Sequence, residues 1–495
     1  MEPWNIGNES TPSNLAKGEL ESASSRRGNR RLCKSLLPSV PAFQCSSILG
    51  LLFCAGLPLA GGAAGDPLTN AASPREFVLR ALAHSPSLRA AERQTDAARQ
   101  QHAQAMAAGR PSVEAEANAG HFEGLQDAVI GPGVVIPSVA DRYGARLGIV
   151  QRLYTGGEVT AQRRAARRLT ESAEAERESV RGRVAMDTLA AYWSWSQADS
   201  LVEALRATVA WMEAHRLDVR SLREAGLANE TDLLAAEAQL ERERLRLSEA
   251  RRQADLARAA LSRLAGTKIA AEQKPRPAPA EFAKEEIPSL DATLLRSTNR
   301  AELAHLECAV RALDENVRAT RADGRPQVSA AAWYEEGRPN LYNFPLEEKW
   351  QDTAFVGLTA SWKIFDSGLV RARVKEKMAQ RDAALGTLDD VREQLRLEAQ
   401  RAHIELGNAL DRARTAASTE AAAGRSLRQT LDYWKNGLAR HSEVLDAEAR
   451  HSEARCARLG ACGDVMLAKA GLAYATGDLM QLVEEPRGPL AEPLE

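Results

Sequence analysis

The sequence predicts an α+β fold in which one structural unit occurs twice, and three observations lead to this prediction. Residues 153–266 can be written above residues 364–477 without a gap, which indicates an internal two-fold repeat. Each copy contains a long stretch without proline, as expected of one very long helix. Each copy also contains two short segments in which small or apolar residues alternate with polar ones, a pattern typical of β-strands.

The repeat divides the chain into five parts. These are a signal peptide with a long basic n-region at 1–65, repeat 1 at 70–267, a proline-rich linker at 268–298, repeat 2 at 299–480 and a tail at 481–495. In repeat 1 we expect an opening helix at about 87–108, strands at about 112–121 and 142–153, a long helix at 158–225 and a return helix at 228–265. In repeat 2 we expect strands at about 327–336 and 353–364, a long helix at 369–436 and a return helix at 439–476.

The N-terminal segment has the order of features found in secretory signals. A cluster of arginines around residues 26–31 precedes the apolar run Ile48–Ala60, and small residues follow at 61–65. The n-region is unusually long, which indicates that translation starts further downstream. The alternative is a disordered cytosolic tail.

Charge and motifs exclude several classes of function. The chain has 65 basic and 67 acidic residues, so its net charge of −2 lacks the basic surplus expected of a nucleic-acid binder. It contains no phosphate-binding loop, no dinucleotide fingerprint and no zinc-protease motif, so we expect no enzyme, no cofactor and no metal site. We expect His441 to be a solvated residue at a helix end, and Cys456 and Cys462 to pair only if their helix is broken between them.

The four strand segments suggest the wall of a membrane barrel. In the segment at 142–153, for example, Leu147 and Ile149 alternate with Arg146 and Gly148, which suits lipid on one face and water on the other. An ordinary soluble hairpin is the alternative. Aromatic residues in the second copy are expected at the membrane interface and the outer loop; these are Trp333, Tyr334, Tyr342, Phe344 and Trp350.

The long helices predict coiled-coil packing and an oligomer. Their apolar residues recur every 3.5 positions, as in Val202, Leu205, Val209 and Met212, and each helix would be about 100 Å long. The two shorter helices of a repeat, placed end to end, nearly match this length. One chain has only four strands, whereas about eight are needed to close a barrel, and lipid does not tolerate an open sheet. The chain must therefore share its strands with other copies.

Taken together, these features resemble the TolC family of outer-membrane efflux and export channels. The resemblance covers about residues 70–480, and its marks are the two-fold repeat, the glycine turns after Tyr154 and Phe365, and the segments around Gly226 and Gly437. It implies a homotrimer with a shared twelve-stranded β-barrel, four strands per chain, and a coiled-coil α-helical tunnel in the periplasm. It also implies a passive exit duct in the outer-membrane lipid, working with a periplasmic adaptor and an inner-membrane pump of the RND or ABC type.

The resemblance assigns roles to residues at the two helix tips. The family's tip motif reads roughly Val-Gly-Leu and then, three residues later, Thr or Ser; here the valine is replaced in both copies. The positions that would dock the adaptor are Gly226, Leu227 and Thr231 in repeat 1, and Gly437, Leu438 and Ser442 in repeat 2. Those that would gate the tunnel or set its selectivity are Asp232, Glu443 and Asp446, with Trp434 holding the closed tip.

Alternatives to these roles remain at the sequence level. Asp232 and Glu443 lie near helix starts, where acids are favoured by the helix dipole, and Thr231 and Ser442 are expected to cap their helices. The alternative function is a periplasmic coiled-coil adaptor protein. Adaptors, however, normally carry one helical hairpin rather than two. A purely structural coiled coil would need neither strands nor a signal.

Overall fold

We describe the fold from a computed structural model that covers residues 73–129, 131, 135–136, 138–279, 287–343 and 346–484. The predicted signal peptide, Phe344 and most of the predicted tail lie outside these residues. The first half contains α1 (Pro74–His84), α2 (Pro86–Ala107), β1 (Ser112–His121), β2 (Ala128–Val129), β3 (Val135–Ile136), β4 (Asp141–Tyr154), α3 (Glu158–Glu224) and α4 (Glu230–Ala265). The second half contains α5 (Leu290–Ser297), α6 (Ala301–Ala322), β5 (Gln327–Arg338), β6 (Gln351–Ser361), α7 (Leu369–Lys435), α8 (His441–Thr476) and α9 (Leu479–Glu484).

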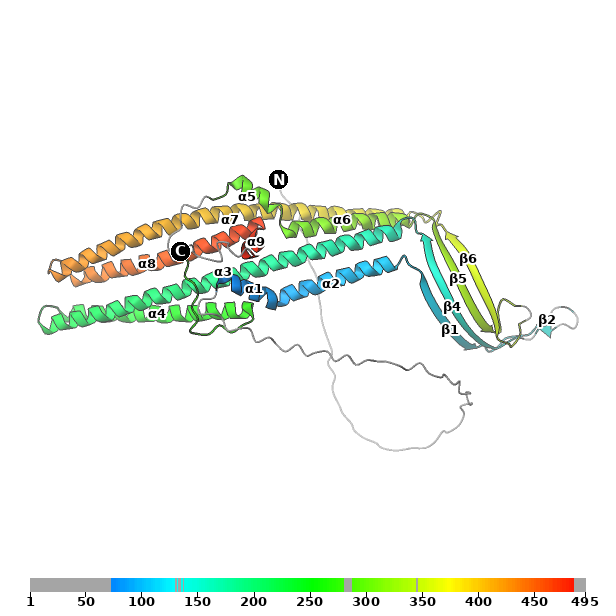
Figure 1. Cartoon of the computed structure of the whole chain (residues 1–495), viewed down its shortest axis with the longest axis horizontal. Helices are drawn as coiled ribbons and strands as arrows, with labels where there is room; N and C mark the ends of the chain where they lie inside the picture. The colour runs from blue at the N-terminus through cyan, green and yellow to red at the C-terminus, as the bar shows by residue number, and fades with distance from the viewer. Residues whose placement is uncertain are drawn as a thin grey trace, which may run out of the picture. The chain divides into compact units, whose positions relative to one another are not determined.

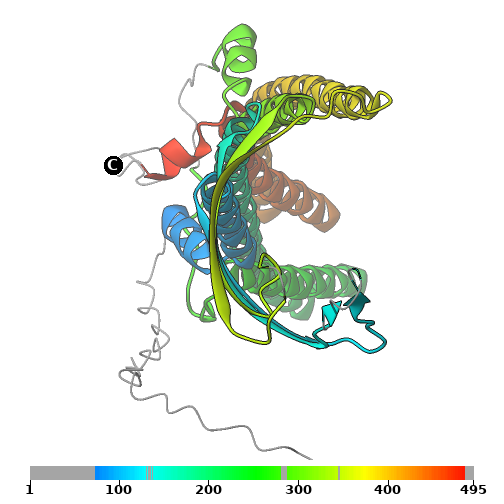
Figure 2. The ribbon, with the colours of Figure 1, turned by 90° about the vertical axis from the view of Figure 1, so that its right-hand side faces the viewer.

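The four long strands form one antiparallel sheet in the order β1-β4-β5-β6, and this sheet is strongly curved (Figure 2). Strands β4 and β5 come from different repeats and pair in the middle, so the sheet joins the two repeats. Among the described strands, β1 and β6 each have a neighbour on one side only. Both outer edges of the sheet therefore carry backbone groups that are free to pair with another chain.

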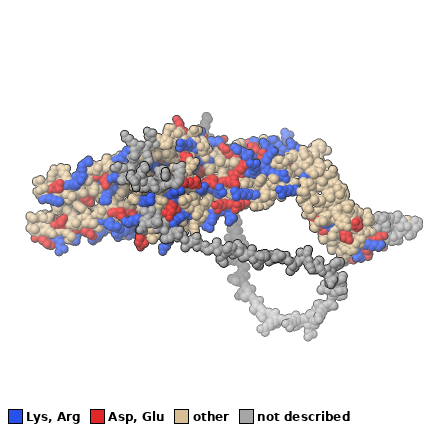
Figure 3. Space-filling model, in the orientation of Figure 1, with Lys and Arg blue, Asp and Glu red and all other residues tan. Residues whose placement is uncertain are grey.

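One face of this sheet is apolar across all four strands. The pairing register places Val113 beside Ile149, Ile149 beside Ala332, and Ala332 beside Val356. Large apolar side chains on this face are exposed within the single chain, among them Leu147, Val356 and Leu358. Figure 3 shows few charged side chains over the part of the strands nearest the helices, whereas the helices are densely charged. The fold therefore needs an apolar environment around this face.

The opposite face of the sheet is polar. Glu116, Arg146, Glu335 and Thr353 form one row across the strands, and Arg146 Nε donates a hydrogen bond to Glu335 (2.8 Å). Trp333 lies on this polar face: its ring stacks on Phe355 (5.3 Å between centroids), and the Arg146 guanidinium lies 4.7 Å from its centroid. The sequence-based placement of Trp333 at the lipid interface was therefore wrong, because its neighbours are charged.

The helices pack as two long rods, each flanked by shorter helices. Helices α2 and α4 both contact α3 at different points along its length, and α6 and α8 contact α7 in the same way (Figure 1). Helix α3 also contacts α6 and α8, so the rods of the two repeats pack together. The apolar seam predicted for α3 is buried at Val202, Leu205, Val209 and Met212. Among the described helices, none combines the length and the apolar character needed to cross a membrane.

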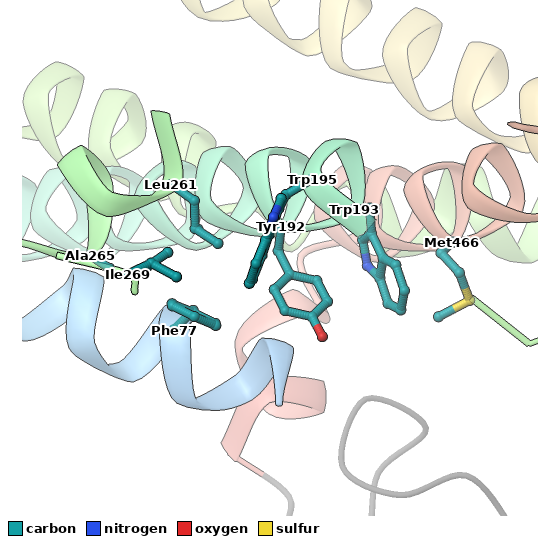
Figure 4. Packing of buried hydrophobic residues seen from close by; sticks show 8 residues of the cluster. All are labelled: Phe77, Tyr192, Trp193, Trp195, Leu261, Ala265, Ile269 and Met466. Atoms are coloured by element: carbon teal, nitrogen blue, oxygen red, sulfur yellow. The ribbon is translucent and has the colours of Figure 1, made fainter. Parts of the chain in front are cut away.

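A cluster of aromatic residues fixes the middle of α3. Tyr192 is fully buried, lies 5.7 Å from Phe77 of α1, and contacts the edge of Trp193 (Figure 4). The sequence did not indicate α1, which supplies Phe77 to this cluster. The Tyr192 hydroxyl accepts a hydrogen bond from the backbone N–H of Arg276, in the segment expected to be a linker (3.0 Å). That segment therefore packs against α3, and its later part contains the helix α5.

Candidate functional site: the two helix tips

Each long helix ends in the same glycine turn. The N–H of Leu227 donates to the carbonyl of Leu222, and the N–H of Leu438 donates to the carbonyl of Tyr433 (2.8 Å in both). This closes the end of the helix with a residue of positive φ, which is Gly226 (+75°) or Gly437 (+71°). A side chain at either position would be strained, because L-residues rarely adopt this conformation.

The residue after each glycine is a large, exposed leucine. Leu227 is 77% exposed and Leu438 is 75% exposed, although the rest of each tip is mostly polar. The ion pair between Arg223 and Glu230 (2.5 Å) links the two helices of the first tip across its turn. Each tip therefore presents one apolar side chain on a turn of defined conformation.

The structure differs from the sequence on what caps the return helices. Helix α4 begins at Glu230, so its N-cap is Asn229, and α8 begins at His441, so its N-cap is Arg440. Thr231 and Ser442 each lie in the first turn and are exposed, so the expectation that they cap these helices was wrong. The cause is that both helices begin two or three residues after the position suggested by the sequence.

The three acids expected near the tips fall into two groups. The Asp232 carboxylate accepts a hydrogen bond from the backbone N–H of Asn229 (3.2 Å), so it stabilises the start of α4. Glu443 and Asp446 are exposed on α8, and neither carboxylate has a partner among the described residues. In repeat 1 the position equivalent to Asp446 is Ala235, also exposed. Only the second tip therefore carries two free acids.

Trp434 belongs to a group of four rings that joins the two tips. His215 of α3 stacks on His441 of α8, with ring centroids 4.9 Å apart and planes 14° apart. Trp211 stacks on the other side of His215 (5.0 Å, 14°), and Trp434 of α7 meets His215 at 5.2 Å. We call these four residues the ring cluster. It connects repeat 1 to both helices of the second tip.

Burial changes the acid–base behaviour of this cluster. His215 is 4% exposed and His441 is 9% exposed. Burial, and then the neighbouring His441, lower the pKa of His215 to about 4. Burial also lowers the pKa of His441, which Asp232 partly opposes. The expectation of a solvated histidine at 441 was therefore wrong, because α3 of the other repeat covers it.

A second buried titratable pair lies further along the return helices. Glu448 of α8 is buried near Glu243 of α4, and burial together with Glu243 raises the pKa of Glu448 to about 7. No group of three or more metal-ligating side chains occurs within the part of the chain that the structure describes. Cys308, Cys456 and Cys462 are free in the structure.

Sequence reasoning missed His215, Trp211 and Glu243. His215 and Trp211 lie four residues apart in the apolar seam of α3, so a histidine beside buried seam positions was the available signal. Nothing local to His215 indicates that its partner is His441, because that contact forms between repeats.

Comparisons with known proteins agree with this architecture. A family model described as outer membrane efflux protein matches residues 78–267 and 296–478, which correspond to the two repeats. Protein CyaE of Bordetella pertussis is 28% identical over 218 residues, and this alignment spans 44% of the chain and 45% of CyaE, about half of that relative's length.

Solved structures of outer-membrane channels have the same fold. The chain is similar to the outer-membrane channel OprN, with a TM-score of 0.70 and 23% identity over 82% of this chain and 90% of that one. It is also similar to the open state of the Neisseria gonorrhoeae MtrE channel, with a TM-score of 0.68 and 20% identity over 82% of this chain and 89% of that one. The family model covers most of both repeats, so the resemblance seen in the sequence is confirmed and the chain belongs to the outer membrane efflux protein family.

Proposed function

We propose that this protein is the outer-membrane channel of a tripartite efflux pump or a type I secretion system. It would be a passive duct through which small molecules or polypeptides leave the cell, with no catalytic step of its own. The observation that carries the proposal is the four-stranded sheet, which has an exposed apolar face and two unpaired edges, and which continues into two long helical rods. Membership of the family supports the same conclusion.

The sheet accounts for the proposed trimer. In lipid, the edge groups of β1 and β6 would be left without hydrogen-bond partners, at a cost of several kcal/mol each. Three copies supply twelve strands, enough to close a barrel, if β1 of each copy pairs with β6 of the next. The apolar face would then contact the outer-membrane lipid, and the row containing Arg146 and Glu335 would line the interior.

The tips account for the proposed partners. Leu227 and Leu438 are exposed apolar side chains on rigid turns, and such residues suit contact with the helical tip of a periplasmic adaptor. Gly226 and Gly437 would keep those turns in shape, and the exposed Thr231 and Ser442 would lie beside the contact. The adaptor would connect the duct to an inner-membrane pump of the RND or ABC type, which would select the cargo.

The free acids account for the proposed gate. In a trimer, a three-fold axis turns Glu443 and Asp446 each into a ring of three carboxylates, which would attract cations and repel one another in a narrow throat. Asp232 would contribute a further ring while also starting α4. Trp434 would hold the closed tip through its contact with His215.

Single-channel current in planar bilayers tests this proposal. The double variant Glu443→Ala/Asp446→Ala should still insert, and it should lose cation preference because two carboxylate rings are gone. Ala235→Asp provides a matched variant of opposite sign, because it adds an acid at the equivalent position of repeat 1, and it should increase cation preference. If the wild-type protein never conducts, the duct is wrong; if conduction persists with unchanged selectivity in both variants, only the acid gate is wrong.

A further inference from the structure

The ring cluster holds its two histidines in an unusual environment. Both ring nitrogens of His441 and Nε2 of His215 are buried without a hydrogen-bond partner in the structure. The two rings nevertheless stack 4.9 Å apart, between Trp211 on one side and Trp434 at the edge. Neutral imidazoles tolerate this arrangement at moderate cost, whereas imidazolium needs acceptors for both of its N–H groups.

Protonation would therefore act directly on the contact between the repeats. A proton on either ring adds an N–H donor with no acceptor in the packed state, and protons on both rings place like charges face to face. The rings come from α3 on one side and from α7 and α8 on the other, so the contact that fails is the one joining the second tip to the first rod.

We propose that the ring cluster is an acid-sensitive latch, in which neutral His215 and His441 hold the two tips together and protonation separates them. The proposal rests on the proposed function only in its consequence, which is that tip separation would widen the periplasmic end of the duct. The latch itself is a property of the helices and does not require a current to be measured.

The charged groups around the latch set the direction of its response. From α3 the pair is faced by Asp218, from α4 by Asp232, and from α7 by the uncharged Trp434; the two acids favour the charged histidines but do not overcome burial. Burial lowers the pKa of His215 from 6.5 to about 4, so the latch is at full strength above about pH 6.5 and weakens as the pH falls toward 4.

Two turns further along α8, Glu448 responds in the opposite direction. With Glu243 opposite on α4, its pKa is raised to about 7, so protonation of Glu448 strengthens the packing as the pH falls. A test of the latch should therefore be made with Glu448→Gln present throughout, which removes this opposing titration.

Electron–electron distances between spin labels on the two tips provide the test. Labels are attached to Leu227→Cys and Leu438→Cys in the full-length, detergent-extracted protein, in which Cys308, Cys456 and Cys462 are replaced by serine and Glu448 by glutamine. We expect a longer distance to appear and to gain population several-fold between pH 7 and pH 4.5. The double variant His215→Phe/His441→Phe keeps two flat rings but cannot be protonated, and it should show no such change.

A matched control uses another histidine of the same helix. His451→Phe lies on α8 outside the ring cluster and should leave the pH response intact. An unchanged wild-type distance between pH 7 and pH 4.5 would overturn the latch, even if the double phenylalanine variant failed to fold. An equal response in that double variant would also overturn it. A distance change in a protein that carries no current would support the latch and reject the duct, so the two proposals can fail separately.

Discussion

At the scale of single residues, the interior of the helical region contains several ionisable groups whose burial has measurable consequences. Glu448 has a raised pKa, so it is protonated in the packed state, and its contribution to stability is complete below its ordinary value of 4.5 and is lost as the pH rises through about 7. From 1.36 kcal/mol per pKa unit, the full range is at most about 3 kcal/mol.

Glu448→Gln should therefore remove part of the alkaline loss of stability. We expect the variant to melt at a higher temperature than wild type at pH 8.5 and at nearly the same temperature at pH 6, measured by thermal unfolding of the extracted protein. Both histidines of the ring cluster are neutral at pH 8.5, so they do not contribute to the difference there. Parallel melting curves at the two pH values would show that Glu448 is solvated.

Arg300 shows how burial separates two ion pairs of similar geometry. It is 4% exposed, pairs with Glu302 (2.8 Å) and Glu398 (2.7 Å), and lies over the ring of Tyr474 (4.7 Å). Arg300→Ala strands the half-buried Glu302 and should cost roughly 3–5 kcal/mol of stability. Glu398→Gln changes only the exposed partner and should cost roughly 0–1 kcal/mol. Equal losses in thermal unfolding would contradict this account of the site.

At the scale of elements, the strands make the most specific prediction. Leu358 lies on the apolar face of β6, and the next residue, Thr359, lies on the polar face. Leu358→Arg should place a charge in lipid, at roughly 2–4 kcal/mol per chain near the middle of the bilayer, and should reduce the amount of assembled protein in outer-membrane fractions. Thr359→Arg is the matched control and should assemble normally, because its side chain faces the water-filled interior. Equal amounts of the two variants in the membrane would mean that the apolar face does not contact lipid.

The elements also show which parts of the fold can be predicted from sequence. The long helices and the strands were predictable because their periods of 3.5 and 2 persist over many residues, and α3 and α7 begin at the residues expected for them. Helices α1 and α5 were not, since each is short and depends on packing against α3 or α7. The ring cluster was hidden for a similar reason: the burial of His441 depends on α3, and no local pattern encodes that contact.

At the scale of the whole molecule, the described fold is complete along its helices but not across its sheet. The two rods bury their own seams against short helices and against each other, which accounts for most of the packing within one chain. The sheet instead leaves both edges unpaired and one face apolar, which a single chain in water or lipid cannot stabilise. The proposed function follows from this imbalance, because three copies resolve it in one step.

The number of chains in each detergent-extracted particle tests this central claim most directly. Native mass spectrometry of the full-length protein should give a mass of three processed chains, and no abundant species of one or two, because only three sets of four strands close the proposed twelve-stranded barrel. A stable single chain, folded and soluble without detergent, would contradict the account, since β1 and β6 would then have to remain unpaired in the native protein.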